Sequence, residues 1–226
     1  MKVVILAGGF GTRIAEANGP KPMVKIGNRP ILYHIMNYYK KFGYNDFIVA
    51  LGYKGNFIKK KFKNSNFNVE FVDTGLNTLT GGRIKRLKKY LNNERFMLTY
   101  GDGLSNVDLK KLLQKHIKSK KIATVTAVRP PARFGEVIIK SNKVVEFSEK
   151  RQSKKNWING GFFVFEPEFL DFIKNDKTSL EAEPLTKLSK KGLLGAYKHE
   201  KFWQCMDTMK DKNYLEKLWK GNPPWK

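Results

Sequence analysis

The residues with the clearest chemistry lie in one short segment near the start of the chain, Leu6-Ala7-Gly8-Gly9-Phe10-Gly11-Thr12-Arg13. This segment follows an apolar, β-branched run, residues 1–5, that is typical of a buried strand. A strand that leads into glycines exposes backbone N–H groups without side chains that would keep a phosphate away. Arg13 adds a planar set of donors, and Lys21, in Lys21-Pro22-Met23, adds a point charge. Together these residues predict a polyphosphate-binding loop at the carboxyl end of the first strand.

Two other glycine-rich phosphate loops do not fit this segment. A dinucleotide-binding fingerprint needs a glycine at the position of Ile14, and a P-loop needs a Gly-Lys-Ser/Thr sequence that does not follow here. A tight turn between a strand and a helix is the alternative interpretation without a ligand.

Two carboxylates stand where strands are expected to end. Asp102 lies between two glycines after the apolar run 96–100, and Asp207 follows the run 202–206. Open α/β sheets bind their ligands at the carboxyl ends of strands. An aspartate can also shape a turn or cap a helix, and Thr208 could share the capping of the helix after residue 208. From position alone, a ligand site and a structural role both stay open.

The composition fits a single enzyme domain. A chain of 226 residues can bury a full core. Cys205 is the only cysteine, and the three histidines show no zinc spacing. The first apolar run stops at Gly8, too early for a signal peptide, and no other run approaches the roughly 18 residues of a membrane span. We expect no membrane association and a cytoplasmic location.

The net charge of +24 raises the question of nucleic-acid binding. Arginine supplies only eight of the 44 basic residues and lysine the other 36, scattered along the chain. Surfaces that read bases rely on arginine and on interleaved aromatic residues. We therefore expect no nucleic-acid partner, although the positive charge can concentrate anionic substrates.

The elements that must position these residues alternate as βαβ units up to residue 128. Strands are predicted at residues 1–5, 47–51, 69–72, 96–100 and 123–128, and helices at residues 31–42, 54–62, 83–91 and 109–117. Beyond residue 134 we expect a hairpin over 137–147, strands at 157–165, 193–197 and 202–206, and helices at 167–174, 181–191 and 209–219. The pattern predicts an α/β fold with a Rossmann-like, mostly parallel central sheet flanked by helices and a small antiparallel hairpin region.

The glycine segment and Lys21-Pro22-Met23 resemble the opening signature of the sugar-nucleotide pyrophosphorylases. Later motifs resemble one branch of that family, the glucose-1-phosphate cytidylyltransferases: Thr80-Gly81-Gly82-Arg83, Tyr100-Gly101-Asp102-Gly103, Asn159-Gly160-Gly161-Phe162-Phe163, residues 202–208 and the terminal Pro223-Pro224-Trp225-Lys226. The resemblance covers nearly the whole chain. It implies a nucleotidyltransferase fold of the GT-A-like type, transfer of CMP from CTP to a sugar 1-phosphate such as glucose 1-phosphate, dependence on Mg²⁺, and a homo-oligomer.

The resemblance also implies a role for individual residues. The nucleotide would be bound by Leu6, Ala7, Gly8, Gly9, Gly11, Thr12, Arg13, Lys21, Thr80, Gly81, Gly82 and Asp102. The sugar phosphate would be bound by Gly103, Glu149, Lys150, Asn159, Gly160 and Glu183. Arg13, Lys21 and Lys150 would be catalytic, and Asp102 and Asp207 would hold Mg²⁺. The single domain, residues 1–226, would then comprise a nucleotide-binding part, 1–128, and a sugar-phosphate-binding part, 129–226.

Two departures from the family pattern leave alternatives open. Arg151 stands where the family has proline, and the segment 56–71 is shorter than its counterpart in the family. The sugar, the choice of CTP over UTP or dTTP, and the family's hexameric assembly therefore stay open. A metal-dependent glycosyltransferase and a basic module that binds RNA are the alternatives from other classes, which pyrophosphate release from CTP separates from a nucleotidyltransferase.

Overall fold

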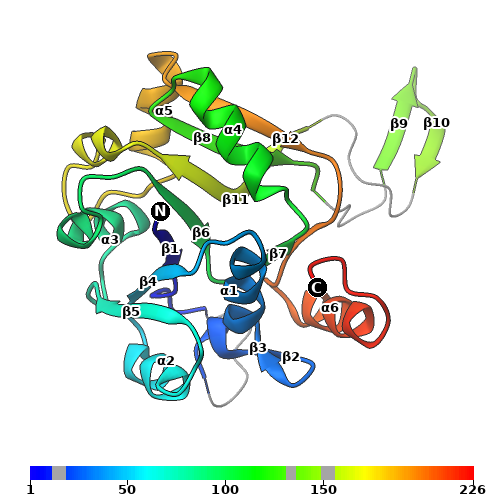
Figure 1. Ribbon diagram of the computed structural model, residues 1–226. Helices are drawn as coiled ribbons and strands as arrows, with labels where there is room; N and C mark the ends of the chain where they lie inside the picture. The colour runs from blue at the N-terminus through cyan, green and yellow to red at the C-terminus, as the bar shows by residue number, and fades with distance from the viewer. Residues whose placement is uncertain (12–18, 131–135, 149–155) are drawn as a thin grey trace.

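The computed structural model is an α/β sandwich built on one seven-stranded sheet with the strand order β12-β8-β11-β6-β1-β4-β5 (Figure 1). It describes residues 1–226 except 12–18, 131–135 and 149–155. The strands of this sheet are β1 (Val3–Leu6), β4 (Asp46–Leu51), β5 (Asn68–Asp73), β6 (Phe96–Tyr100), β8 (Ala123–Val128), β11 (Ile158–Phe165) and β12 (Leu194–His199). The α-helices are α1 (Ile31–Lys41), α2 (Gly55–Phe62), α3 (Thr80–Arg86), α4 (Leu109–Ser119), α5 (Glu183–Lys190) and α6 (Met209–Lys220).

The sheet is mostly parallel, which confirms the predicted fold class. β1 pairs in parallel with β4 and with β6, β4 with β5, and β8 with β12. β11 is antiparallel to both of its neighbours, β6 and β8. Because of this direction, the carboxyl ends of β1, β4 and β6 and the amino end of β11 meet at the same edge of the sheet. The loops at this edge carry the site.

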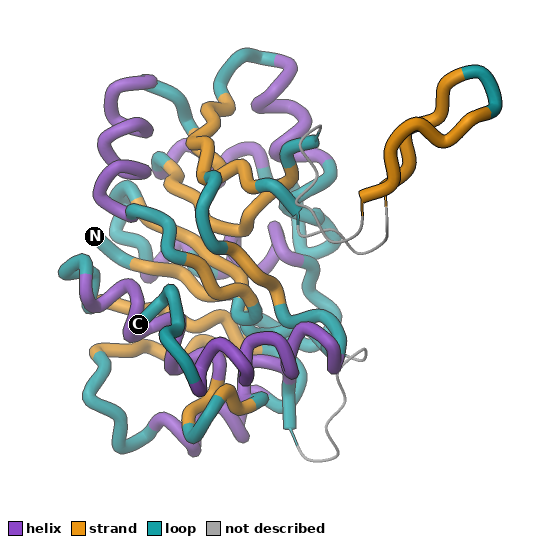
Figure 2. The backbone as a smooth tube through the Cα atoms, turned by 90° about the vertical axis from the view of Figure 1, so that its right-hand side faces the viewer, coloured by secondary structure: helices purple, strands orange, loops and turns teal. Residues whose placement is uncertain are grey.

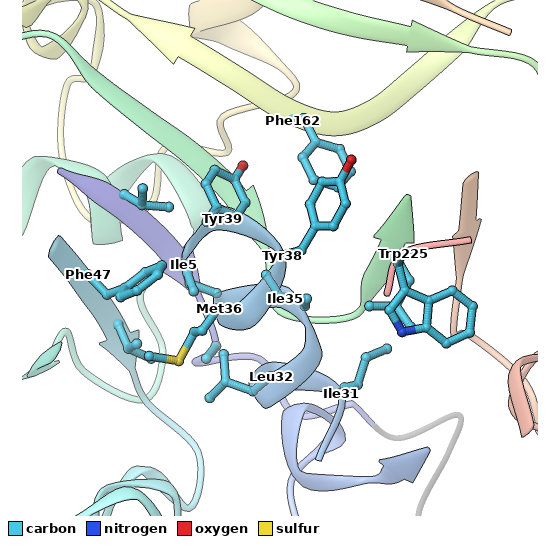
Figure 3. Packing of buried hydrophobic residues seen from close by; sticks show 14 of the residues in the cluster. Ile5, Ile31, Leu32, Ile35, Met36, Tyr38, Tyr39, Phe47, Phe162 and Trp225 are labelled. Atoms are coloured by element: carbon cyan, nitrogen blue, oxygen red, sulfur yellow. The ribbon is translucent and has the colours of Figure 1, made fainter. Parts of the chain in front are cut away.

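Alternate residues of the central strands pack into two separate cores. Val3 and Ile5 of β1 join the core that α1 covers, whereas Val4 and Leu6 face the core on the side of α3. Figure 3 shows Ile5 and Phe47 of the sheet packed against the apolar side of α1. Each large apolar side chain buried in this way contributes about 1.5–3 kcal/mol to folding. Because both faces of the sheet are covered, every residue of β1 and nearly every residue of β4 is buried, which explains their continuous apolar runs.

Three two-stranded ribbons accompany the main sheet. β2 (Lys25–Ile26) pairs with β3 (Arg29–Pro30), and β7 (Gly103–Ser105) pairs with β13 (Trp203–Cys205). The predicted hairpin is present as β9 (Glu136–Lys140) and β10 (Lys143–Ser148). It stands away from the body of the molecule in Figure 2. Within the described part of the chain, no helix is long and apolar enough to cross a membrane.

Three predicted helices differ in the structure. The predicted helix 83–91 is α3, which begins at Thr80, followed by a 3-10 turn, η3 (Lys88–Tyr90). Gly82 lets this first turn pack closely, because a Cβ there would lie 2.5 Å from the backbone of Asp176, a tertiary contact that apolar spacing cannot reveal. The predicted helix 167–174 is a 3-10 helix, η4 (Pro167–Phe172), and the helix predicted from residue 181 begins at Glu183.

Candidate active site

The ribbon of β7 and β13 brings two distant carboxylates together. β6 ends at Tyr100, and the chain turns through Gly101 and Asp102 into β7. β13 pairs antiparallel with β7, so that Cys205 lies opposite Gly103 and the N–H of Met206 donates to the carbonyl of Asp102 at 2.8 Å. Asp207, one residue further on, therefore lies beside Asp102 at the carboxyl edge of the sheet.

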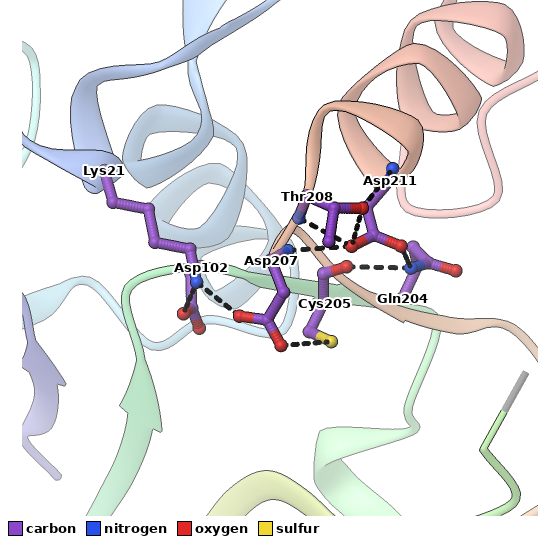
Figure 4. Close-up of polar contacts among 7 residues, drawn as sticks. All are labelled: Lys21, Asp102, Gln204, Cys205, Asp207, Thr208 and Asp211. Atoms are coloured by element: carbon purple, nitrogen blue, oxygen red, sulfur yellow. Dashed lines mark hydrogen bonds and ion pairs between the residues drawn. The ribbon is translucent and has the colours of Figure 1, made fainter. Parts of the chain in front are cut away.

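Lys21 bridges the two carboxylates. Its Nζ donates to Oδ2 of Asp102 at 2.6 Å and to Oδ1 of Asp207 at 2.7 Å (Figure 4). The Lys21 side chain is 14 % exposed, and those of Asp102 and Asp207 are 29 % and 24 % exposed. Burial opposes the charged form of Lys21, but the two carboxylates outweigh it and hold the pKa of Lys21 above its usual value. The predicted catalytic lysine is thus a fixed ammonium group between the predicted metal ligands.

The cap of α6 leaves the Asp207 carboxylate available for this contact. Thr208 is the N-cap and forms a capping box with Asp211. A carboxylate oxygen of Asp211 also accepts the N–H of Asp207 at 3.0 Å, and its other oxygen accepts from Gln204 Nε2 at 2.9 Å. The alternative in which Asp207 caps the helix is wrong: Thr208 takes that role, and the Asp207 side chain extends to Lys21 (Figure 4).

Cys205 is not a nucleophile in this arrangement. Burial and then the neighbouring carboxylate of Asp207 raise the pKa of the Cys205 thiol to about 12. The thiol stays protonated at neutral pH, and its Sγ donates weakly to Oδ2 of Asp207 at 3.6 Å. This arrangement therefore does not activate Cys205 as a nucleophile.

The glycine segment lies next to these residues. Gly101 donates its N–H to the carbonyl of Leu6 at 3.0 Å, which joins the loops after β1 and β6. Gly11 has φ +61°, and a Cβ there would lie 2.7 Å from Cβ of Lys21. Among the described residues, no atom lies within 4 Å of the position that a Cβ would take on Gly9 or Gly103. These two glycines leave space at the edge where phosphate and sugar phosphate were predicted.

The buried side chain of Arg83 supports the glycine segment from the interior. Arg83 is part of the Thr80-Gly81-Gly82-Arg83 motif, but no role of its own was predicted for it. The residue is 5 % exposed, and a Cβ on Gly8 would lie 2.3 Å from its Nη1. Its guanidinium donates to five acceptors from three segments of the chain: the carbonyls of Leu51, Gly75, Gly8 and Leu76 and the hydroxyl of Thr74. Burial lowers the pKa of Arg83 from its ordinary value. The sequence feature that could have indicated a buried Arg83 is its position directly after Gly81 and Gly82, in the first turn of a helix.

A second polar cluster surrounds Tyr100. Glu181 accepts hydrogen bonds from the Tyr100 hydroxyl at 2.6 Å, from Thr80 Oγ1 at 2.7 Å and from Ser179 Oγ at 2.7 Å. Asn159 Nδ2 donates to the Tyr100 hydroxyl at 3.2 Å. Although burial opposes ionisation of Glu181, these donors outweigh it and keep the pKa of its carboxyl below the usual value. The sequence predicted Thr80 and Asn159 of this cluster as site residues, but not Tyr100, Ser179 or Glu181.

Glu183 lies outside the Tyr100 cluster. It forms ion pairs with Lys187 at 2.7 Å and Lys174 at 2.9 Å, which lower the pKa of its carboxyl to about 2. The two glutamates are separated by one residue, and α5 begins between them and turns Glu183 toward these lysines. The structure therefore brings Glu181 to Asn159 and does not bring Glu183 there.

The other predicted residues have the following positions. A Cβ on Gly81 would lie 2.8 Å from the carbonyl oxygen of Thr178, so that glycine allows α3 to pack against the neighbouring segment. The carbonyl of Gly160 accepts from Trp203 Nε1 at 2.7 Å. Four predicted site residues lie outside the described residues: Thr12, Arg13, Glu149 and Lys150.

The pair of aspartates suits a magnesium ion. Mg²⁺ is commonly bound by one or two carboxylates, with water and substrate phosphate oxygens as its other ligands. Asp102 and Asp207 already share one cation, the ammonium of Lys21. Among the residues that the structure describes, no group of three or more His, Cys, Asp and Glu side chains forms a metal site. The two carboxylates therefore fit a metal ion that also takes ligands from substrate phosphates. They do not fit a structural metal site in which the protein supplies every ligand.

A glycine loop, a lysine and two carboxylates at the carboxyl edge of a doubly covered sheet define a nucleotide-binding α/β enzyme. The sequence model of the family described as "Nucleotidyl transferase" matches residues 2–213, and the chain belongs to this family. It is 46 % identical to the glucose-1-phosphate cytidylyltransferase of Salmonella typhimurium over 100 % of this chain and 99 % of that protein.

The chain is also similar to a guanylyltransferase and to a solved crystal structure. The chain is 34 % identical to the D-glycero-α-D-manno-heptose 1-phosphate guanylyltransferase of Aneurinibacillus thermoaerophilus over 83 % of this chain and 84 % of that protein. The crystal structure of HddC from Yersinia pseudotuberculosis superposes with a TM-score of 0.77 at 29 % identity, covering 96 % of this chain and 99 % of that one. The fold and the family predicted from the sequence are confirmed.

Proposed function

We propose that the protein transfers CMP from CTP to glucose 1-phosphate and releases pyrophosphate. The observation that carries this proposal is the contact of Lys21 with both Asp102 and Asp207 beside the glycine segment. The full-length similarity to the Salmonella typhimurium enzyme supports CTP and glucose 1-phosphate as the substrates. The positive net charge of +24 favours the approach of two anionic substrates.

The proposed chemistry needs positioning and charge neutralisation and no general base. A sugar 1-phosphate is already an anion at neutral pH, so its oxygen can attack the α-phosphorus of CTP directly, in line with the departing pyrophosphate. Lys21 would neutralise charge at the α-phosphate, and Arg13 with the glycine amides would hold the β- and γ-phosphates. Lys150 would orient the attacking sugar phosphate. Mg²⁺ held by Asp102 and Asp207 would supply further positive charge to the nucleotide phosphates.

The Tyr100 cluster supports a sugar-binding role for that edge of the site. Asn159 Nδ2 and the Tyr100 hydroxyl are hydrogen-bonded to each other, and Gly103, three residues after Tyr100, leaves space where a side chain would lie. Glu181 fixes the Tyr100 hydroxyl and thereby orients the donor and acceptor groups that sugar hydroxyls would contact. We assign Glu181 this positioning role in preference to Glu183.

Pyrophosphate release from CTP, UTP, dTTP, ATP and GTP, each with Mg²⁺ and glucose 1-phosphate, tests the proposed reaction. We expect release with CTP, and CDP-glucose as the second product. Release with another nucleotide and none with CTP would refute the cytidylyl assignment. Release that requires a different sugar 1-phosphate would refute glucose as the acceptor while leaving the reaction class intact.

We also propose a homo-oligomer that covers the hairpin β9–β10. Apolar side chains on this hairpin are strongly exposed, with Ile139 at 61 %, Val144 at 58 % and Phe147 at 68 %. An isolated two-stranded hairpin is marginally stable in water, and a second copy of the chain would offer an identical apolar ribbon to pack against it. The expected mass in light scattering is that of an oligomer. A monomer, or an oligomer that the substitution Ile139→Asp leaves unchanged relative to the control Lys140→Gln, would contradict the proposal.

Since both proposed substrates are intermediates of cytoplasmic metabolism, the cytoplasm is the proposed location.

A further inference from the structure

The cation between the two carboxylates belongs to the protein itself. Lys21 Nζ lies 2.6 Å from Asp102 and 2.7 Å from Asp207, the distances of charge-assisted hydrogen bonds. A divalent cation that used both carboxylates would have to occupy this same place. The ammonium group and a divalent cation repel each other, and they compete for the same two oxygens.

The surroundings hold Lys21 and Asp207 in this arrangement. Lys21 begins a short 3-10 turn, Lys21–Met23, and its Cβ sits against Gly11 where any side chain would collide. The backbone N–H of Asp207 is fixed by the Asp211 carboxylate, which is itself part of the cap of α6. The bridge is therefore built by three parts of the chain, and its formation does not depend on a ligand.

We propose that Lys21 substitutes for the metal in the nucleotide-free protein, so that the two aspartates become available to a divalent cation only when nucleotide phosphates draw the ammonium away. The protein alone then binds divalent cations weakly, and the metal enters together with the nucleotide. This inference rests on the proposed function for the identity of the nucleotide, but the exclusion of metal from the free protein does not depend on it. Lys21 thereby keeps the metal out of the free protein before catalysis, in addition to its proposed neutralisation of charge at the α-phosphate during catalysis.

The test is Mn²⁺ binding to the free protein, measured from the electron paramagnetic resonance signal of unbound Mn²⁺. Removing the ammonium in Lys21→Met should tighten Mn²⁺ binding by roughly tenfold or more, because a monovalent and a divalent cation about 4 Å apart repel by that much even in water. Lys21→Arg keeps the positive charge and should bind Mn²⁺ as weakly as the unaltered protein. Lys25→Met, at an exposed lysine nearby, is the matched control and should change nothing.

Three results would overturn the inference. One is equal Mn²⁺ affinity for Lys21→Met and the unaltered protein. Another is tighter binding that persists when Asp102→Asn is added to Lys21→Met, since the ion would then lie elsewhere. The third is tight Mn²⁺ binding by the unaltered protein without nucleotide. Pyrophosphate release by the unaltered protein tests the proposed function separately: its absence together with tighter Mn²⁺ binding by Lys21→Met would refute the reaction and leave the metal exclusion standing.

Discussion

Replacing Arg83 should destabilise the protein more than replacing any exposed arginine. The guanidinium is 5 % exposed and donates to five acceptors. Two of these acceptors, Leu51 and Gly8, also accept from other backbone N–H groups, so Arg83→Met deprives mainly the Gly75 and Leu76 carbonyls of their donor. A hydrogen bond to a charged group contributes about 1.5–3 kcal/mol. Because the bonds to Gly75 and Leu76 are only partly buried, we take the lower value for each and expect the free energy of unfolding to decrease by about 3 kcal/mol.

Urea denaturation followed by tryptophan fluorescence measures this loss. The control is Arg86→Met on the same helix, because the Arg86 side chain is 45 % exposed and pairs with an exposed Asp176. We expect a much smaller change for the control than for Arg83→Met. Since Arg83 also supports Gly8 in the proposed phosphate-binding segment, Arg83→Lys should fold and show a raised KM for CTP. Equal urea midpoints for Arg83→Met, Arg86→Met and the unaltered protein would refute this interpretation of Arg83.

Three further predictions follow from named contacts. Glu181→Gln should raise the KM for glucose 1-phosphate by about tenfold, whereas Glu183→Gln should leave it unchanged; the reverse order in steady-state kinetics would contradict our placement of the two glutamates. Burial lowers the pKa of His116 below its usual value, so the unfolded chain takes up a proton that the folded chain does not, and stability present above about pH 6.5 is lost as the pH falls below it. The decrease in urea midpoint between about pH 7.5 and about pH 5.5 should therefore be smaller for His116→Gln, and an equal decrease would remove His116 as a cause. Excess EDTA should abolish pyrophosphate release and added Mg²⁺ should restore it, so release that continues in EDTA would exclude the metal.

The strands and most helices could be predicted because their apolar residues have a clear periodicity. β1 and β4 are covered on both faces and read as continuous apolar runs, and α1 ends before Gly43 as predicted. The elements that were missed or misplaced depend on tertiary contacts. α3 begins at Thr80, just before Gly81 and Gly82, which approach the backbones of Thr178 and Asp176 as the tertiary fold requires. β7 was missed because it has only three residues, too few for an alternating pattern, whereas β13 lies within the predicted strand 202–206.

The candidate site could be predicted at the level of loops and less well at the level of contacts. The position of Asp102 and Asp207 after strands singled them out, and the family resemblance predicted that they act as a pair, but their meeting depends on the β7–β13 ribbon. Glu181 and Glu183 have the same chemistry and nearly the same position in the sequence, and only the start of α5 separates their directions. Arg83 was not expected to turn inward, because a buried arginine needs acceptors from several loops and these are set by the fold alone.

The turnover number of Asp207→Asn with CTP, glucose 1-phosphate and Mg²⁺ tests most directly whether the carboxylate pair is the reaction centre. A preorganised group of this kind contributes about 2.7–4 kcal/mol to catalysis, by analogy with oxyanion-hole donors. We therefore predict that kcat falls at least about a hundredfold in a variant that still unfolds cooperatively in urea, while Asp171→Asn at an exposed aspartate leaves kcat unaltered. Near-normal turnover in Asp207→Asn would contradict the assignment of the site.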